Sequence, residues 1–183
     1  MSQSLRGHRL VAVPQLLDPN FKRTVILLLE HGDDGALGLV LNRPSELPVR
    51  GTIDEWAGVA SDPPVIFVGG PVASSSVIAL AEISAGSTSD DFAPISGPIG
   101  TVDLERSPTE IGAITRMRAF AGYAGWAPAQ LEAELGEGGW FVVDLHPDDP
   151  FSSEPDDLWW GVLGRQGGDL GRLRHFPRDL ADN

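Results

Sequence analysis

Cysteine is missing from all 183 residues of the chain, and Lys22 is its only lysine beside twelve arginines. The lack of thiols excludes disulfides, cysteine nucleophiles and every zinc site built on sulfur. No apolar run approaches the roughly 18 residues that span a bilayer. Residues 1–20 also lack the charged-then-apolar pattern of a signal peptide. We therefore expect a cytoplasmic protein that does not insert into a membrane.

Positive charge is scarce as well, because 13 Lys and Arg oppose 26 Asp and Glu, which gives a net charge of −13. This balance argues against broad binding to nucleic acid or to anionic membranes. Two blocks stand out: 144–157 contains only acidic charges, whereas 165–178 contains four arginines and one aspartate. We interpret both as solvated surface, with ion pairing between them as the alternative.

The strong sequence motifs of catalysis and cofactor binding are absent. The chain has no P-loop, dinucleotide fingerprint, nucleophile elbow, zinc-protease motif or calcium loop. Glu30 and His31 are adjacent in an expected strand, so their side chains point to opposite faces and do not form a natural acid–base pair. Histidine is scattered, at positions His8, His31, His146 and His175. The sequence therefore predicts no metal and no cofactor.

Apolar runs predict a chain rich in β-strands. The runs at 24–29 and 36–41 are apolar throughout, as in strands buried on both faces. They flank Gly32-Asp33-Asp34-Gly35, so we expect them to form an antiparallel hairpin. Further strands are expected at 9–13, 65–68, 77–83, 99–102, 117–123 and 140–143. The stretch 84–98, rich in Ser, Gly, Pro and Asp, is predicted to be a loop.

Helix start signals lie between and after these strands. Thr52 with Glu55 has the spacing of a capping box, and Ser107-Pro108 places a cap directly before a first-turn proline. Further helices are expected at 128–137 and from residue 153. Strands and helices mix without strict alternation, so the predicted fold class is α+β, in one domain over 1–183.

The densest polar group surrounds the open end of the expected hairpin. It consists of Asp18, Asn20, Arg23, Asn42 and Arg43. A turn that closes at His31 and Ala36 would place the two arginines on opposite faces. A slip of one residue would place Arg23 directly opposite Arg43 on the same face. Same-face arginines repel unless Asp18 or a bound anion lies between them, so this end is either an internal Asp–Arg network or an anion pocket.

Two further segments are candidates for the same site. Gly69 and Gly70 follow a strand, where successive amides can cradle an anion or where glycine merely permits a sharp turn. Trp126 and Gln130 lie where a strand passes into a helix, so they either contact a ligand or serve as core and cap. We predict that Trp126 is buried and that its ring borders the hairpin end carrying Asn42.

Three segments resemble the bacterial AlgH/YqgE family. They are LVAVPQLLDPNFKRTVILLLEHGDDGALGLVLNRP at 10–44, IFVGGPV at 66–72 and FAGYAGWAPAQLEAEL at 120–135, followed by GGW. The resemblance implies a bifurcated, coiled mixed β-sheet that is partly barrel-like and surrounded by helices. One departure is Ala129, where the family usually has glycine. The shared motif positions are Asp18, Asn20, Phe21, Arg23, Asn42, Arg43, Pro44, Gly69, Gly70, Pro71, Gly125, Trp126 and Gln130.

The family resemblance supplies no catalytic residues. Members carry the label of transcriptional regulator of alginate synthesis, but the acidic charge and the lack of a DNA-reading motif argue against direct DNA binding. We favour a binding or regulatory module that recognises a small anionic ligand or a protein partner. The alternatives are an enzyme of hydrolase or transferase type and a transcriptional regulator. The hypothetical ligand site comprises Asp18, Asn20, Arg23, Asn42, Arg43, Gly69, Gly70, Trp126 and Gln130.

Overall fold

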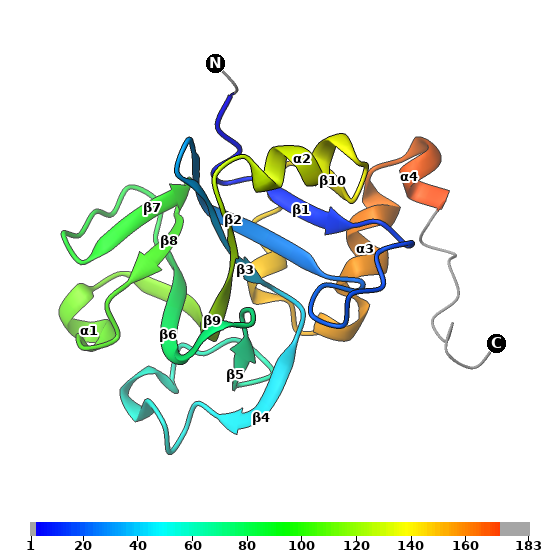
Figure 1. The fold of residues 1–183 in the computed structure, drawn as a ribbon. Helices are drawn as coiled ribbons and strands as arrows, with labels where there is room; N and C mark the ends of the chain where they lie inside the picture. Colours follow the sequence, from blue (N-terminus) through cyan, green and yellow to red (C-terminus); the bar gives the residue numbers. More distant parts are fainter. Residues whose placement is uncertain (1–2, 173–183) are drawn as a thin grey trace.

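One long, strongly curved sheet of ten strands dominates the computed structural model, which describes residues 3–172 (Figure 1). The strands are β1 (Arg9–Ala12), β2 (Val25–Gly32), β3 (Gly35–Val40), β4 (Pro44–Pro48), β5 (Val65–Val68), β6 (Val72–Ile83), β7 (Phe92–Ser96), β8 (Ile99–Val102), β9 (Ile114–Trp126) and β10 (Trp140–Val143). The helices are α1 (Pro108–Ile111), α2 (Gln130–Gly136), α3 (Leu158–Arg165) and α4 (Gly168–Arg172). Single 3₁₀ turns are η1 (Asp54–Trp56), η2 (Asp149–Phe151) and η3 (Pro155–Asp157).

Strand β9 is the branch point of the sheet. The main path runs β10-β1-β2-β3-β9-β6-β8-β7, and β4 and β5 form a side branch. Phe120 of β9 pairs with β6 in antiparallel and with β5 in parallel fashion, so these two strands flank it on opposite edges. Further along β9, Ala124 pairs with Gly38 of β3. Strand β3 lies on the same edge of β9 as β5, as shown by the hydrogen bond from the Val40 N–H of β3 to the Gly69 carbonyl just after β5. The sheet is thus mixed and bifurcated, as expected.

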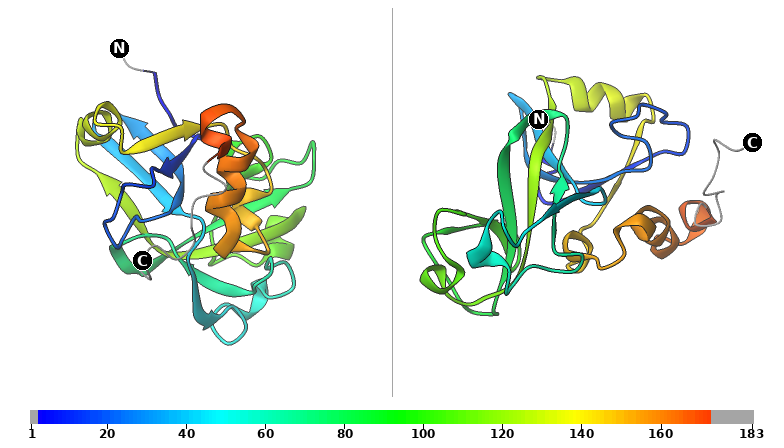
Figure 2. Two further views of the ribbon diagram at one scale, coloured as in Figure 1. Left: turned by 90° about the vertical axis from the view of Figure 1, so that its right-hand side faces the viewer. Right: turned by 90° about the horizontal axis from the view of Figure 1, so that it is seen from below.

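Both faces of the central strands are buried. Val25, Leu27 and Leu29 of β2 face one core, which includes Trp159 of α3. Ile26 and Leu28 of the same strand face a second core beneath α2. This alternation explains the unbroken apolar run at 24–29, because each successive residue enters a different core. Figure 2 shows α2 and α3 on opposite sides of this part of the sheet.

The helices do not surround the sheet, and this expectation was wrong. α2, α3 and α4 gather on the side away from β7 and β8, and only the short α1 lies near those strands (Figure 1). The sheet is also not closed into a barrel. Among the described strands, β7 and β10 lie at the two ends of the path and do not pair with each other. Arg6 connects β2 with β7, donating from Nε to the Leu29 carbonyl (3.0 Å) and from Nη2 to the Pro94 carbonyl (2.8 Å).

Proline explains the strands that the sequence pattern missed. β7 lies inside the predicted loop 84–98 and contains Pro94, while β4 begins and ends with proline. Both strands pair on one edge only, where a missing N–H is tolerated.

Of the helix starts, Ser107 is confirmed as the cap of α1, because its hydroxyl accepts from the Glu110 N–H (3.2 Å). The Thr52–Glu55 capping box is wrong: η1 follows Ile53, and within residues 3–172 no side chain caps it. No helix of the described residues is both long and apolar enough to cross a membrane.

Candidate functional site

A bulge in the β2–β3 hairpin decides its register. His31 lies opposite Ala36, as the first alternative required. The register then shifts between Leu28 and Glu30, so that Ile26 lies opposite Val40. Continued to the open end of the hairpin, this shifted register places Arg23 opposite Arg43. Each alternative therefore holds on one side of the bulge.

Side chains replace the strand ladder at the open end. Asn42 accepts from the Val25 N–H through Oδ1 (3.1 Å) and donates from Nδ2 to the Arg23 carbonyl (2.9 Å). Arg23 has a left-handed φ of 55°, which turns its side chain out of the ladder. Its guanidinium lies 5.8 Å and 5.1 Å from the ring centroids of Trp159 and Trp160. Arg23 therefore packs against α3, and repulsion from Arg43 is avoided.

Arg43 borders a narrow hollow of about 60 Å³. Its half-buried guanidinium donates from Nη2 to the Lys22 carbonyl (3.1 Å). Among the described residues, Arg43 forms no ion pair with a carboxylate within 4.0 Å. Burial lowers the pKa of Arg43 and the charge of Asp18 opposes that shift, but the group stays a cation at neutral pH. The hollow is lined by Asn20, Val40, Arg43, Val68, Gly70 and Pro71.

Asp18 organises the loop that carries Asn20 to this hollow. Its Oδ1 accepts from the Asn20 N–H (2.9 Å), and its carbonyl accepts from Phe21 (2.9 Å) and Lys22 (2.7 Å). Both Asp18 and Asn20 are exposed. The carboxylate is thus used in turn formation, and it acts on Arg43 through its charge alone.

Gly69 and Gly70 allow the chain to pass directly against β9. A Cβ on Gly69 would lie 2.3 Å from the Gly122 carbonyl oxygen, and one on Gly70 would lie 2.1 Å from the Tyr123 carbonyl carbon. Only glycine fits such close backbone approaches. Both positions therefore have a steric explanation, and Gly70 additionally forms a wall of the Arg43 hollow.

Trp126 is buried, with 7% of its surface exposed, as predicted. Its backbone, however, pairs with Ala36 near the hairpin turn, far along β3 from Asn42. Its ring stacks on Phe21 (6.4 Å between centroids) and meets Trp140 edge-on (6.2 Å). The ring thus belongs to the core under α2.

Gln130 belongs to the first turn of α2. Its Oε1 accepts from the Ala127 N–H (2.9 Å), and its Nε2 donates to Glu134 (2.9 Å). The other Glu134 oxygen accepts from the indoles of Trp126 (3.2 Å) and Trp140 (3.0 Å). Ala129 keeps a left-handed φ of 64° although it lacks the freedom of glycine. Trp126 therefore belongs to the core, as one alternative had it, whereas Gln130 ties the loop before α2 to Glu134 and, among the described residues, no side chain caps the start of α2.

His31 has a partner that the sequence did not indicate. Its Nε2 lies 2.6 Å from Oε1 of Glu132 on α2, and its Nδ1 accepts from the Leu5 N–H (2.8 Å). Because Nδ1 accepts a backbone proton, the ring proton sits on Nε2 and points at Glu132. This hydrogen bond holds the pKa of Glu132 below its ordinary value. The two residues are 101 positions apart, beyond the reach of a local pattern.

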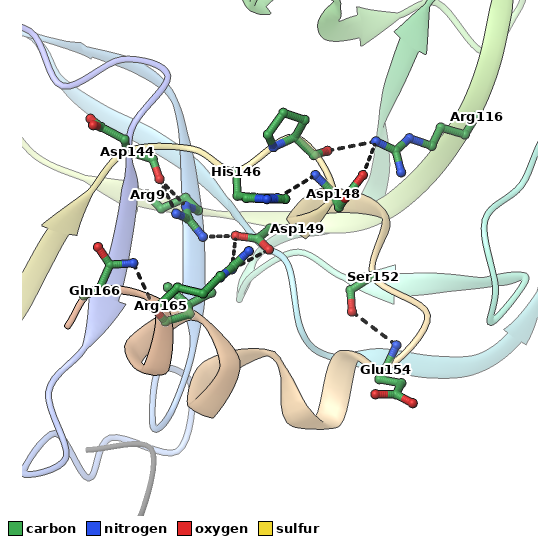
Figure 3. Close-up of polar contacts among 12 residues, drawn as sticks. Arg9, Arg116, Asp144, His146, Asp148, Asp149, Ser152, Glu154, Arg165 and Gln166 are labelled. Carbon is green, nitrogen blue, oxygen red and sulfur yellow. Dashed lines mark hydrogen bonds and ion pairs between the residues drawn. The ribbon is translucent and has the colours of Figure 1, made fainter. Parts of the chain in front are cut away.

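The acidic block 144–157 is partly internal (Figure 3). Asp149 is buried, with 3% of its surface exposed, and forms an ion pair with Arg9 of β1. Both of its carboxylate oxygens also accept hydrogen bonds from Arg165 of α3 (2.7 and 2.8 Å). Burial, followed by the charge of Arg165, lowers the pKa of Arg9 to about 10. The interpretation as solvated surface was wrong for Asp149, and the ion-pairing alternative holds for Arg165. Positions 174 and 178 lie outside the described residues.

A second arginine of the sheet holds the same segment. Arg118 is 2% exposed and donates to the carbonyls of Ser152 (2.8 Å) and Asp62 (2.6 Å). Its guanidinium lies over the Phe67 ring (4.2 Å), and burial lowers its pKa to about 10. These contacts are structural. Within residues 3–172, no group of three or more His, Asp or Glu side chains could hold a metal ion.

Comparisons with known proteins cover almost the whole chain. The family model described as DUF179, AlgH-like, matches residues 9–171. A UPF0301 protein of Streptomyces coelicolor is 47% identical over 186 residues, covering 98% of this chain and 96% of that protein. A crystal structure of a Corynebacterium diphtheriae protein has a TM-score of 0.89 at 31% identity, covering 96% of this chain and 94% of that one. The solution structure of the AlgH protein from Pseudomonas aeruginosa has a TM-score of 0.69 at 30% identity, covering 97% and 98%.

Proposed function

Because the chain belongs to the AlgH-like family, a membership that carries no catalytic residues with it, we propose that it is a binding module for an anionic head group. The site is the hollow beside Arg43. The observation that carries the proposal is a half-buried guanidinium with no carboxylate partner among the described residues. In a chain of net charge −13, such a cation marks a place where an external anion is favoured.

The size of the hollow limits what it holds. Its volume of about 60 Å³ is roughly that of two water molecules in the liquid. A carboxylate or phosphate group therefore enters, and the rest of the ligand or partner protein stays outside. The planar fork of Arg43 matches the oxygens of either group, and the Asn20 amide supplies further donors at the wall.

Catalysis is the less favoured function. The lining of the hollow offers no nucleophile and no general base. The titratable pair His31–Glu132 lies elsewhere and has both ring nitrogens engaged, so neither is available to a substrate. A regulator role would likewise act through a bound ligand or protein, because one recessed cation takes a single phosphate and not a DNA backbone.

Thermal unfolding at increasing phosphate or acetate tests the proposal. A ligand at ten times its Kd stabilises the folded state by about 1.4 kcal/mol. We expect this gain in the wild type and in Arg50→Ala, which removes an exposed arginine outside the hollow. Arg43→Ala should lose it while its melting temperature without added anion changes by a few degrees at most.

General salting effects of phosphate act on all three proteins equally, so only the difference between variants counts. If Arg43→Ala and Asp18→Ala both unfold the protein, the group is an internal ion network and the proposal is wrong.

A further inference from the structure

The principal core lies on one face of the sheet, and that face is covered along only part of its length. At one end, Phe151, Leu158 and Trp159 of η2 and α3 pack onto it and are buried. At the other end, Leu37 and Ile78 belong to the same core but are only half-buried. Seen from below, α3 lies well away from β6, β7 and β8 (Figure 2).

Two adjoining hollows occupy the uncovered end. The larger, about 590 Å³, extends from the β2–β3 turn over Val72 and Tyr123. The smaller, about 330 Å³, lies between Ile78 and the strands β2 and β7. Leu37 and Glu30 line both hollows. Together they form one elongated groove of mixed lining, to which Leu37, Ile78 and Tyr123 contribute apolar surface.

The rim of this groove is acidic. Glu30 lies between the hollows, Asp33 and Asp34 lie at the turn, and all three are exposed. None of them forms an ion pair with any described residue. Arg6, which lines the smaller hollow, donates to the carbonyls of Leu29 and Pro94 instead of to Glu30. Apolar side chains beside unpaired carboxylates are complementary to a surface that is partly apolar and basic.

We propose that this groove docks a basic, partly apolar peptide segment of a partner protein. Apolar side chains of the segment replace water over Leu37, Ile78 and Tyr123, while its Lys or Arg side chains pair with the rim carboxylates. The Tyr123 ring adds a face for cation–π contact. A segment fits better than a compact metabolite, because metabolite sites enclose about 70–90% of their ligand and this groove is long and open. The site is independent of the Arg43 hollow.

Fluorescence anisotropy with a labelled Val-Lys-Val-Lys-Val-Lys peptide in about 150 mM salt, where long-range charge effects are screened, tests this docking site. The wild type should bind with a Kd below about 1 mM. Replacing the rim carboxylates together, as Glu30→Gln, Asp33→Asn and Asp34→Asn, should weaken binding about tenfold. The matched control Glu46→Gln, Glu55→Gln and Glu105→Gln removes the same charge from exposed positions elsewhere and should change Kd by less than about twofold.

A steric variant tests the floor without touching any charge. Gly125 lines the larger hollow, and a Cβ there would meet Tyr123 at 3.7 Å and Val72 at 4.0 Å, ordinary contact distances. Gly125→Leu should therefore fold normally, fill the hollow and weaken the peptide about tenfold.

The docking site is overturned by an equal loss in the charge control, by wild-type affinity in Gly125→Leu, or by no saturable binding to the wild type. Displacement of the peptide by free lysine amide at equal concentration would instead assign the groove to small cations, which also contradicts the proposal.

Discussion

The two ends of the β2–β3 hairpin differ in charge and in the space beside them. At the open end, half-buried Arg43 borders a hollow of about 60 Å³. At the turn end, Glu30, Asp33 and Asp34 surround a hollow of about 590 Å³. The same two strands thus present a narrow cationic recess and a broad acidic groove, which suit opposite kinds of partner.

The difference arises from what lies next to each end. Gly69 and Gly70 bring the β5–β6 connection directly against β9, and this narrows the space around Arg43. At the turn end, the described chain supplies no such cover, so the floor at Leu37 stays half-exposed. The two surfaces therefore differ in size as well as in charge, and the volume of each hollow depends on how closely the neighbouring backbone approaches it.

The largest expected effect is a loss of stability when the Asn42 side chain, which joins the two strands at the open end of the hairpin, is removed. Asn42→Ala removes the hydrogen bonds to Val25 and Arg23 and leaves the buried Val25 N–H without its partner. We expect a loss of about 2–3 kcal/mol in the free energy of unfolding, measured by urea denaturation. Asp34→Ala at the exposed turn should change it by less than about 0.5 kcal/mol. Equal losses in the two variants would show that the open end does not depend on the Asn42 side chain.

A smaller effect separates the two arginines of the open end. Arg23→Met keeps an apolar stem but removes the cation over Trp159 and Trp160, which should cost about 1 kcal/mol of stability. The stabilisation of the protein by phosphate should be unchanged in this variant, because Arg23 does not line the hollow. Loss of the phosphate response in Arg23→Met would place both arginines in one site.

The smallest effect is a pH dependence at the turn end, where His31 ties the hairpin to α2. The pKa of Glu132 is lowered by its hydrogen bond to His31, so the pair adds stability above the ordinary pKa of 4.5 and loses it as the pH falls through the lowered value. Urea unfolding of wild type and Glu132→Gln should therefore differ at pH 6 and converge only below the lowered pKa of Glu132. A difference that persists at low pH would mean that the Glu132 charge does not matter.

The sequence predicted a strand and a helix cap that depend on neighbouring residues, and it missed features that depend on contacts between distant segments. The apolar run at 24–29 identified a strand buried on both faces, and Ser107 identified a helix cap, because both signals are local. The bulge between Leu28 and Glu30 was not predictable, because the Gly-rich turn is compatible with either register.

The candidate site was resolved only in part for the same reason. Asn20, Arg43 and Gly70 meet at one hollow, whereas the left-handed φ of Arg23 sends its side chain to α3. Trp126 serves the core beneath α2. Asp18 and Asn42, which the sequence pattern placed in the same group, do not line the hollow. The direction of each side chain followed from backbone conformation that no residue pattern displays.

One measurement tests the separation of the two ends most directly: amide chemical shifts of the ¹⁵N-labelled protein, titrated first with phosphate and then with the Val-Lys peptide. Phosphate should shift the amides of Asn20, Arg43 and Gly70, and the peptide should shift those of Glu30, Asp34 and Gly125. Each set should respond to its own ligand alone. Overlapping responses, or phosphate shifts that are the same in Arg43→Ala, would contradict the account of two distinct binding surfaces on one hairpin.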